Sequence, residues 1–413
     1  MRRRAVALLA LAVAGCGGHA HRHPTPTPAA HGASRPSPAA QLQALLNRRA
    51  RALQAGDPSA LAATSVGAQR AWDRRAARRA HALRLRAVSI VALSAGRVRL
   101  TYGLAGTAGT FTATRAVRAV RRAGGLRIAA ERPAGARDRL PWDIATFQRH
   151  QTRHFVILAS AGVRARGLAA ALAIGRRQVT TALPGVQVPD RLAVFVAASA
   201  GQARLLTRAI RGVESLAAIA EAIVRVRGPA QRVFQVAGQR LIVIWPDYAR
   251  LDATDRQRVV THELTHAATA RRTSGRTPAW LVEGIALYAS GDERADEAGE
   301  LLSGRRLAGV DAAGRRAAVQ AATLTALAKP DAIARRTGVP QAAAYAYASA
   351  AAFAIANRFG RAGLLRLYDE FSDPALPGRP GARLQARAIR RALHETQAAL
   401  AAQIRRYALA RAG

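Results

Sequence analysis

The sequence of 413 residues contains a single cysteine, Cys16, so no disulfide bond can form within the chain. It also contains a single lysine, Lys329, and only 24 acidic residues against 64 basic ones, which gives a formal net charge of +40. The arginines are spread along the whole chain. We therefore attribute the excess mainly to the arginine bias of a GC-rich coding sequence, and we expect no nucleic-acid partner.

The N-terminus has no apolar run of the roughly 20 residues that a membrane-spanning helix needs. Residues 1–16 instead have three arginines, a short apolar run from Ala5 to Ala14, and then Gly15-Cys16, which predicts a secretory signal. The ending Val-Ala-Gly-Cys resembles a bacterial lipobox, and this resemblance implies lipidation of Cys16. The alternative is a chance cysteine in a cleaved signal. We expect a lipid anchor on the extracytoplasmic face of the cell membrane, where an anionic leaflet attracts basic residues by on the order of 1 kcal/mol each.

About half of the residues are apolar, which is enough for a sizeable core in two or three domains. Residues 17–40 are rich in Pro, Ala and Ser and lack a hydrophobic period, which predicts an extended linker. A flexible linker gives no fixed coordination geometry, so we expect solvated side chains rather than a metal site from its four histidines, His19, His21, His23 and His31.

Residues 41–135 predict a small α+β unit. Helices come first, over 41–55 and from the break at 55–58 to about residue 79, and strand-like runs follow at 84–93, 97–104, 110–120 and 125–131. This order predicts a curved antiparallel sheet packed on helices. The stretch 53–61 resembles the opening of NTF2-like domains, a fold that hosts enzymes, binding proteins and spacers. Three residues of this unit could line a cavity, but we expect them to be packing or surface residues rather than a functional site: Trp72, Asp73 and His81.

Residues 150–413 predict a small sheet followed by a mainly helical part, which is again α+β. The chain has strand patterns at 154–158, 191–197 and 241–245, helical patterns at about 164–183 and 200–225, nearly continuous helix after residue 245, and a Pro/Gly-rich loop at 374–381. The strand 241–245 is a candidate sheet edge for an extended peptide, with a buried strand as the equal alternative.

The chemistry centres on the pentapeptide His262-Glu263-Leu264-Thr265-His266, which lies in a helical pattern over 254–271. Two histidines at i and i+4 share one helix face, so both imidazoles can reach one zinc ion. Glu263 stands beside them, near enough to take a proton from a water at the metal. Alone, the pentapeptide is a moderate signal, because a helix with two surface histidines and a glutamate has the same spacing.

A second motif follows in the run PAWLVEGIALY at 278–288, which carries Glu283 seventeen residues beyond His266. The two motifs in this order resemble the gluzincins, the zinc metallopeptidases of the peptidase MA-like families, and the resemblance covers about residues 150–413. It implies that Glu283 is the third protein ligand of one zinc ion per chain and that Glu263 is the general base. The fourth metal position is left to water.

The remaining residues of the second motif predict structure rather than catalysis. Gly284 and Ala286 are small enough to permit close helix packing, and Trp280 and Tyr288 are better explained as core residues than as catalytic ones.

Many gluzincins also use a tyrosine to stabilise the oxyanion, and Tyr345 and Tyr347 are the candidates here. Tyr345 matches the aminopeptidase-like branch better, because Ala348 and Gly360 stand at the matching spacings. Burial of either ring as packing in the alanine-rich helix 341–359 is an equal alternative.

Other features depart from the family pattern. The Gly-Ala-Met-Glu-Asn segment that grips a substrate N-terminus has no counterpart. Val282 stands where many relatives have asparagine, and Leu287 stands where some have an acidic residue that orients a ligand histidine. The acidic run 291–300 predicts a solvated loop.

These observations predict a membrane-anchored zinc metallopeptidase, endopeptidase-like, that hydrolyses a peptide or protein substrate. The alternative is an envelope scaffold or binding lipoprotein with a silent peptidase-like domain and the 41–135 unit as its recognition module.

Overall fold

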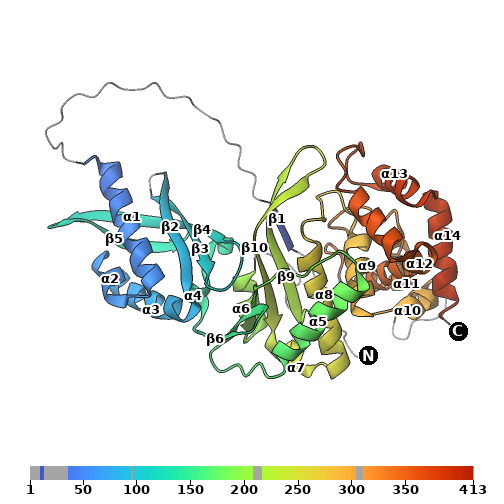
Figure 1. The fold of residues 1–413 in the computed structure, drawn as a ribbon, viewed down its shortest axis with the longest axis horizontal. Coiled ribbons are helices and arrows are strands. Elements are labelled where there is room, and N and C mark those ends of the chain that lie inside the picture. The colour runs from blue at the N-terminus through green and yellow to red at the C-terminus, as the bar shows by residue number, and fades with distance from the viewer. Residues whose placement is uncertain (1–9, 14–35, 95, 208–215, 304–309, 413) are drawn as a thin grey trace.

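The computed structural model describes residues 10–13, 36–94, 96–207, 216–303 and 310–412, and Figure 1 shows their arrangement. The fold is α+β, as predicted, with two sheets followed by a mainly helical C-terminal part. Cys16 and the four linker histidines lie outside the described residues. Among the residues described, no helix is both long and apolar enough to cross a membrane.

The N-terminal elements match the predicted order of helices and then strands. Ser37 caps the first helix through its side chain, and Asp57 caps the second after Gly56 ends the first with φ of 66°. The elements are α1 (Pro38–Ala55), α2 (Pro58–Ala63), α3 (Ala68–Leu83), β2 (Leu85–Ser94), β3 (Arg97–Leu104), β4 (Phe111–Arg122) and β5 (Gly125–Pro133). The strands form one antiparallel sheet in the order β2-β3-β4-β5.

A buried ionic network ties these N-terminal elements together. Arg49 of α1 contacts Asp73 of α3 and Glu131 of β5, each at 2.7 Å. Arg115 of β4 contacts Glu131 at 3.1 Å and Asp143 at 2.7 Å. Each charge therefore has a partner in the interior. Of the residues considered for a cavity, Asp73 belongs to this network, Trp72 lies under the Arg115 guanidinium, and His81 is exposed.

The second sheet has six strands in the order β1-β9-β10-β8-β7-β6. The chain reaches it through η1 (Ala136–Asp138) and α4 (Pro141–Ile144). Its strands are β1 (Ala10–Val13), β6 (Phe147–Gln151), β7 (Phe155–Ser160), β8 (Leu192–Ala197), β9 (Ala218–Arg227) and β10 (Arg232–Ile244), and the helices α5 (Leu168–Ala182) and α6 (Ala200–Leu206) lie between them in the chain.

In this region one prediction is wrong, and the structure decides between two alternatives that the sequence left open. The predicted helix over 200–225 is the short helix α6 followed, from Ala218, by the strand β9. Pairing with β10 along the hairpin overrides the helical pattern of this alanine-rich segment. The strand predicted as a candidate edge, 241–245, lies in β10, which pairs with β9 on one side and β8 on the other. It is an interior strand, and Trp245 already belongs to the next helix.

The two faces of the large sheet are covered by different parts of the chain. Ala218 and Ala220 of β9 face the core shared with the C-terminal helices, whereas Ile219 and Ile223 face a core shared with the N-terminal unit. That second core includes Phe111 of β4 and Leu46 of α1. The backbone of Thr110 also donates to the carbonyl of Ala237 at 2.6 Å. The N-terminal unit therefore forms part of the interior that supports the sheet.

The C-terminal part packs as a layer of helices, at the right of Figure 1. These are α7 (Trp245–Arg250), α8 (Ala253–Thr269), α9 (Ala279–Ser290), α10 (Ala295–Leu302), α11 (Ala312–Ala321), α12 (Gly338–Glu370), α13 (Ala382–Leu393) and α14 (Gln397–Leu409). The acidic run 291–300 is not the predicted solvated loop. Its first part buries Asp292 against Arg294, and its second part starts α10, because Ala295 and Ala298 fill the core.

Candidate metal centre

The pentapeptide occupies the second half of α8. Asp252 caps this helix by accepting a hydrogen bond from the backbone of Asp255 at 2.8 Å. His262, Glu263 and His266 are all buried, as is the apolar Leu264 that faces the core. The helix therefore carries these three ionisable side chains into the interior, a costly placement unless they have a shared partner.

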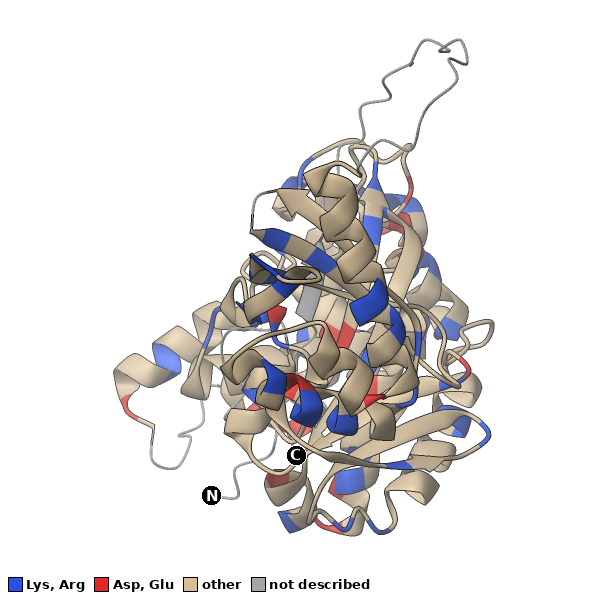
Figure 2. Ribbon diagram, turned by 90° about the vertical axis from the view of Figure 1, so that its left-hand side faces the viewer, with Lys and Arg blue, Asp and Glu red and all other residues tan. Residues whose placement is uncertain are grey.

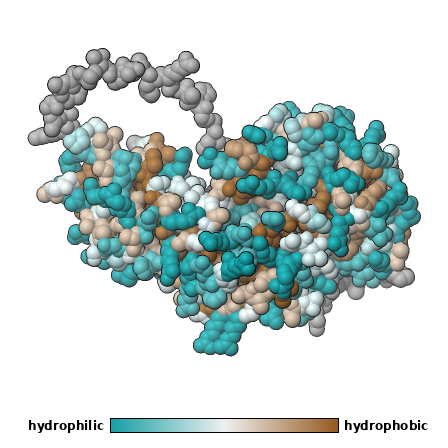
Figure 3. All heavy atoms as spheres, in the orientation of Figure 1, coloured by the Kyte–Doolittle hydropathy of each residue, from teal (hydrophilic) through white to brown (hydrophobic). Residues whose placement is uncertain are grey.

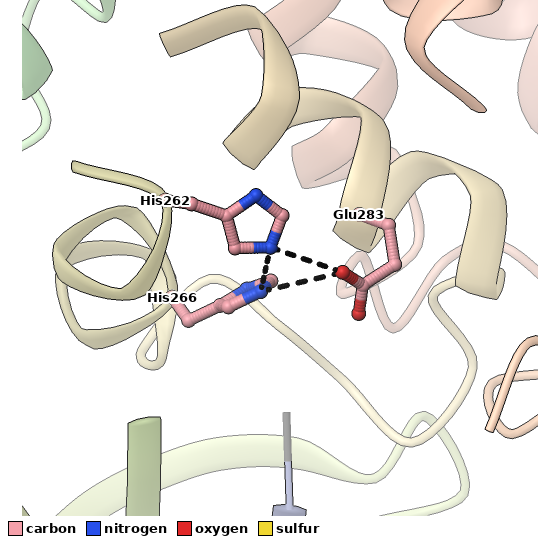
Figure 4. Close-up of side chains that lie close together, drawn as sticks. All are labelled: His262, His266 and Glu283. Carbon is pink, nitrogen blue, oxygen red and sulfur yellow. Dashed lines mark hydrogen bonds and ion pairs between the residues drawn. The ribbon is translucent and has the colours of Figure 1, made fainter. Parts of the chain in front are cut away.

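The second motif forms α9, which lies beside α8. The helix starts directly after Pro278 and ends at Gly291, whose φ of 65° allows the left-handed C-cap. Glu283 projects from it toward the two imidazoles, as Figure 4 shows. The structure therefore brings together the three residues that the sequence predicts as metal ligands. Within the described part of the chain they are the one group of three such residues whose ligand atoms converge, all within 4.8 Å of one another.

The distances between these atoms fit a zinc ion. Nε2 of His262 lies 3.0 Å from Nε2 of His266 and 3.2 Å from Oε2 of Glu283, and Nε2 of His266 lies 3.5 Å from that oxygen. A tetrahedral zinc ion with bonds of about 2.0–2.1 Å separates its ligand atoms by about 3.3–3.4 Å. The three atoms thus form one face of such a tetrahedron, and two imidazoles with a carboxylate are a donor set that zinc accepts.

The buried charges change one another's protonation. Burial alone would raise the pKa of Glu283, but the imidazoles of His266 and His262 outweigh it and lower the pKa to about 2. Burial lowers the pKa of His262, whereas at His266 the carboxylates of Glu283 and Glu263 outweigh burial and raise the pKa. Glu283 is therefore an anion at neutral pH, as a metal ligand must be.

Glu263 is held from the neighbouring sheet. The backbone N–H of Ala220 in β9 donates to its Oε2 at 2.5 Å, and its Oε1 is buried with no hydrogen-bond partner among the described residues. Burial raises the pKa of Glu263 to about 8. With this pKa the carboxyl carries its proton at neutral pH when no metal is bound, and a cation at the three ligands would favour the ionised form. The ionised carboxylate, with one oxygen fixed and the other free, can accept a proton at a defined position.

The two tyrosines have different surroundings. Tyr345 is buried, and its pKa is raised well above the usual value by burial and by the carboxylates of Glu283 and Glu263. The pKa of Tyr347 is also raised by burial, and its hydroxyl is hydrogen-bonded to the backbone of Leu324. Of the two rings, that of Tyr345 therefore shares the electrostatic environment of the metal centre.

Close packing between helices fixes the site. A β-carbon on Gly284 would lie 2.5 Å from the carbonyl oxygen of Ala348 in α12, so the absence of a side chain lets α9 and α12 touch. This contact agrees with the close packing predicted from the second motif, and it lies one residue beyond Glu283 and three beyond Tyr345. A β-carbon on Gly175 of α5 would lie 3.1 Å from the end of the Leu264 side chain, so α5 also packs closely against α8.

The aromatic residues of the second motif pack in the core, as predicted. Trp280 is fully buried and donates from Nε1 to Gln385 at 2.7 Å, and Tyr288 packs edge-on against Phe353. Gly360 interrupts α12 with φ of 71°, fifteen residues after Tyr345.

Two groups near the candidate metal centre were not predicted from the sequence. The first is the backbone amide of Ala220, which no side-chain pattern can reveal. The second is the buried pair Asp292 and Arg294, 2.7 Å apart, whose loop is held by Ser349 through bonds to both backbones. The sequence did contain one sign of this pair, because Asp292 directly follows Gly291, the glycine that ends α9.

Comparison with known proteins gives little further information. No protein-family model matches the sequence, and no curated protein matches it. A solved structure of a mutant M1 zinc metallopeptidase from Deinococcus radiodurans superposes with a TM-score of 0.31 at 17% sequence identity. The match covers 78% of this chain and 63% of that protein, so the chain spans less than two thirds of its length. Superposition at this level is too loose to place the two in one family.

Proposed function

We propose that this protein is a zinc-dependent peptidase that hydrolyses peptide bonds in a peptide or protein substrate. The observation that carries the proposal is the convergence of His262, His266 and Glu283 at the separations of a tetrahedral zinc face, beside a glutamate with a free oxygen. A zinc ion, when bound, supplies Lewis acidity that polarises a peptide carbonyl and acidifies water.

The residues of the chain then have separate roles. Glu263 accepts the proton of the attacking water on Oε1, while the amide of Ala220 keeps Oε2 in place, and the same carboxyl returns the proton to the leaving amine. Tyr345 donates its hydroxyl proton as a hydrogen bond to the developing oxyanion. Its raised pKa keeps the phenol protonated at neutral pH, as a donor must be.

We further propose that the protein acts at the extracytoplasmic face of the cell membrane, anchored by a lipid on Cys16. The support is the basic and apolar N-terminal segment that ends in Val-Ala-Gly-Cys, followed by a Pro-rich stretch before α1. The anchor and the peptidase activity are separable properties, because the replacement Cys16→Ala in the full-length chain should release the protein from the membrane fraction and leave peptide cleavage unchanged.

The test of the peptidase is the metal content of the chain from residue 17 onward, beside its Glu283→Ala variant and the matched control Glu300→Ala. Glu300 is exposed, so its loss should leave the metal centre intact. We expect about one zinc per chain in the parent and in the control, and a large loss in Glu283→Ala, because two histidines alone hold zinc weakly. Absence of zinc from all three proteins would overturn the proposal.

A further inference from the structure

Six large apolar side chains are exposed among the described residues. Three of them lie near the ends of two hairpins: Val91 and Leu93 of β2 are 49% and 44% exposed, and Phe234 of β10 is 49% exposed. The other three are scattered over separate helices, namely Ile174, Leu205 and Val319. Single exposed apolar residues are ordinary, but the three hairpin residues share further properties.

Both hairpins belong to stretches without a single acid. No Asp or Glu occurs between Asp73 and Glu131 or between Glu221 and Asp247. The β9–β10 hairpin exposes three arginines beside Phe234, with the guanidinium of Arg227 over its ring at 5.7 Å. None of the exposed hairpin arginines lies in an ion pair with a described carboxylate: Arg97, Arg99, Arg225, Arg227 and Arg232. Apolar tips with uncompensated positive charge complement an anionic interface.

The hairpins also extend in a common direction. In Figure 1 both the β2–β3 and the β9–β10 hairpins point to the upper edge of the molecule, where α1 begins. Figure 3, in the same orientation, shows apolar surface at both places. Basic residues occur over the whole fold (Figure 2), so charge alone selects no face. The upper edge is distinguished because it combines the exposed apolar residues, the two hairpins without acidic residues and the start of α1.

The chain before α1 can reach a membrane from this side. Residues 17–37 separate Cys16 from the start of α1 at Pro38, and this stretch spans at most about 70 Å when fully extended. Once the predicted signal, which includes β1, is removed, an anchor at Cys16 would hold the upper edge of the molecule within that distance of the bilayer surface. The anchor therefore keeps the two hairpins close enough to the bilayer for them to contact the lipid.

We propose that the ends of the β2–β3 and β9–β10 hairpins form a docking surface for an anionic lipid bilayer. Val91, Leu93 and Phe234 enter the headgroup region, and the neighbouring arginines pair with lipid phosphates. Docking at two points orients the anchored protein and sets the direction in which its metal centre faces. The inference rests on the proposed membrane location, but the lipid surface itself can be tested without the anchor.

The experiment measures binding of the unlipidated chain, residues 17–413, to vesicles of phosphatidylcholine alone or mixed with phosphatidylglycerol. We expect sedimentation with the anionic vesicles only, weakening as salt rises. The triple variant Val91→Ser, Leu93→Ser, Phe234→Ser and the triple variant Arg225→Gln, Arg227→Gln, Arg232→Gln should each bind about 10- to 100-fold more weakly.

The fold supplies matched controls for both variants. The triple variant Ile174→Ser, Leu205→Ser, Val319→Ser removes the other three exposed apolar side chains, which are 37–40% exposed. The triple variant Arg383→Gln, Arg387→Gln, Arg390→Gln removes three exposed arginines of α13. Both controls should bind like the parent. An equal loss of vesicle binding in a control and in its matched hairpin variant would show that total charge or total apolar surface attracts the protein to the vesicles. That result would overturn the proposed docking surface.

Three other results would also overturn the proposal: binding to neutral vesicles as tight as to anionic ones, tighter binding to duplex DNA than to vesicles, or self-association through the β2 edge that the Val91, Leu93 and Phe234 substitutions abolish. Zinc content and cleavage of a soluble peptide, measured on the same hairpin variants, should stay at the parent level. Failure of lipid binding therefore remains distinguishable from failure of the peptidase function.

Discussion

The backbone N–H of Ala220 donates a hydrogen bond of 2.5 Å to Oε2 of Glu263, and this bond joins the sheet to α8. Because the donor is a backbone group, the position of Glu263 depends on the placement of β9 rather than on one side chain. The other carboxylate oxygen is left free in the interior. In the proposed mechanism, this bond holds the buried acid in position for proton transfer without a charged partner on Oε2.

Replacement Glu263→Gln should abolish peptide hydrolysis and leave metal binding intact. An amide keeps the size of the side chain and can still accept the bond from Ala220, but it cannot take a proton from water. We expect kcat to fall by about 10²–10⁴-fold, the usual contribution of general acid–base catalysis. Peptide cleavage and zinc content are the paired measurements. Loss of zinc together with activity would contradict the assigned role of Glu263 and make it a structural residue.

Replacement of the two tyrosines by phenylalanine separates their roles. Tyr345→Phe should lower kcat by about 10²–10³-fold, the typical effect of losing one oxyanion donor, with KM and zinc content unchanged. Tyr347→Phe is the control, because its hydroxyl bonds to the backbone of Leu324, and it should cost about 0.5–1.5 kcal/mol of stability with little effect on kcat. Equal activity of both variants would remove Tyr345 from the mechanism.

Replacement Gly284→Ala tests the contact between α9 and α12. The added methyl group would lie 2.5 Å from the carbonyl of Ala348, so the helices must separate. We expect a loss of about 1–3 kcal/mol in the free energy of unfolding, as for other overpacked cores, and weaker zinc binding because Glu283 moves with α9. Urea denaturation and zinc titration measure the two effects.

Gly201→Ala in α6 is the control for that substitution. The nearest atom to its added β-carbon, Ser199 Oγ, is 3.8 Å away, and alanine is the better helix former, so stability should not fall. Similar losses for both glycines would mean that the loss at Gly284 does not come from the contact between α9 and α12.

Replacement Glu131→Gln tests the buried ionic network. Burial would raise the pKa of Glu131, but Arg49 and Arg115 outweigh it and lower the pKa below the usual value. A lowered folded-state pKa means that the carboxylate stabilises the fold above its unfolded pKa, and that this stabilisation is lost as pH falls through the folded value. The glutamine variant should be less stable by about 3–5 kcal/mol at neutral pH, since two arginines lose a buried partner.

The pH dependence provides the discriminating measurement for the network. Urea denaturation from neutral pH down into the acid range should show the difference between parent and Glu131→Gln shrinking below the ordinary glutamate pKa. A difference that stays constant across that range would mean that the substitution acts through packing and not through charge.

Local patterns predicted most of the individual elements. Caps such as Ser37 and Asp57 and the breaks at Gly56 and Gly291 fix where helices start and stop, and they act over a few residues. The segment 218–227 was misjudged because its alanines allow a helix, and only pairing with β10 makes it a strand. The NTF2-like assignment of the N-terminal unit remains a prediction.

The sequence by itself determined the donor atoms of the metal centre, because i and i+4 spacing on one helix sets His262 and His266 side by side at any location in the fold. Only the tertiary structure decided that Glu283 reaches them, that Ala220 holds Glu263, and that β9 rather than β10 lies beside α8. These relationships join segments that are far apart in the chain. They depend on packing at Gly284 and on strand order, which hydrophobic periodicity along a single segment does not encode.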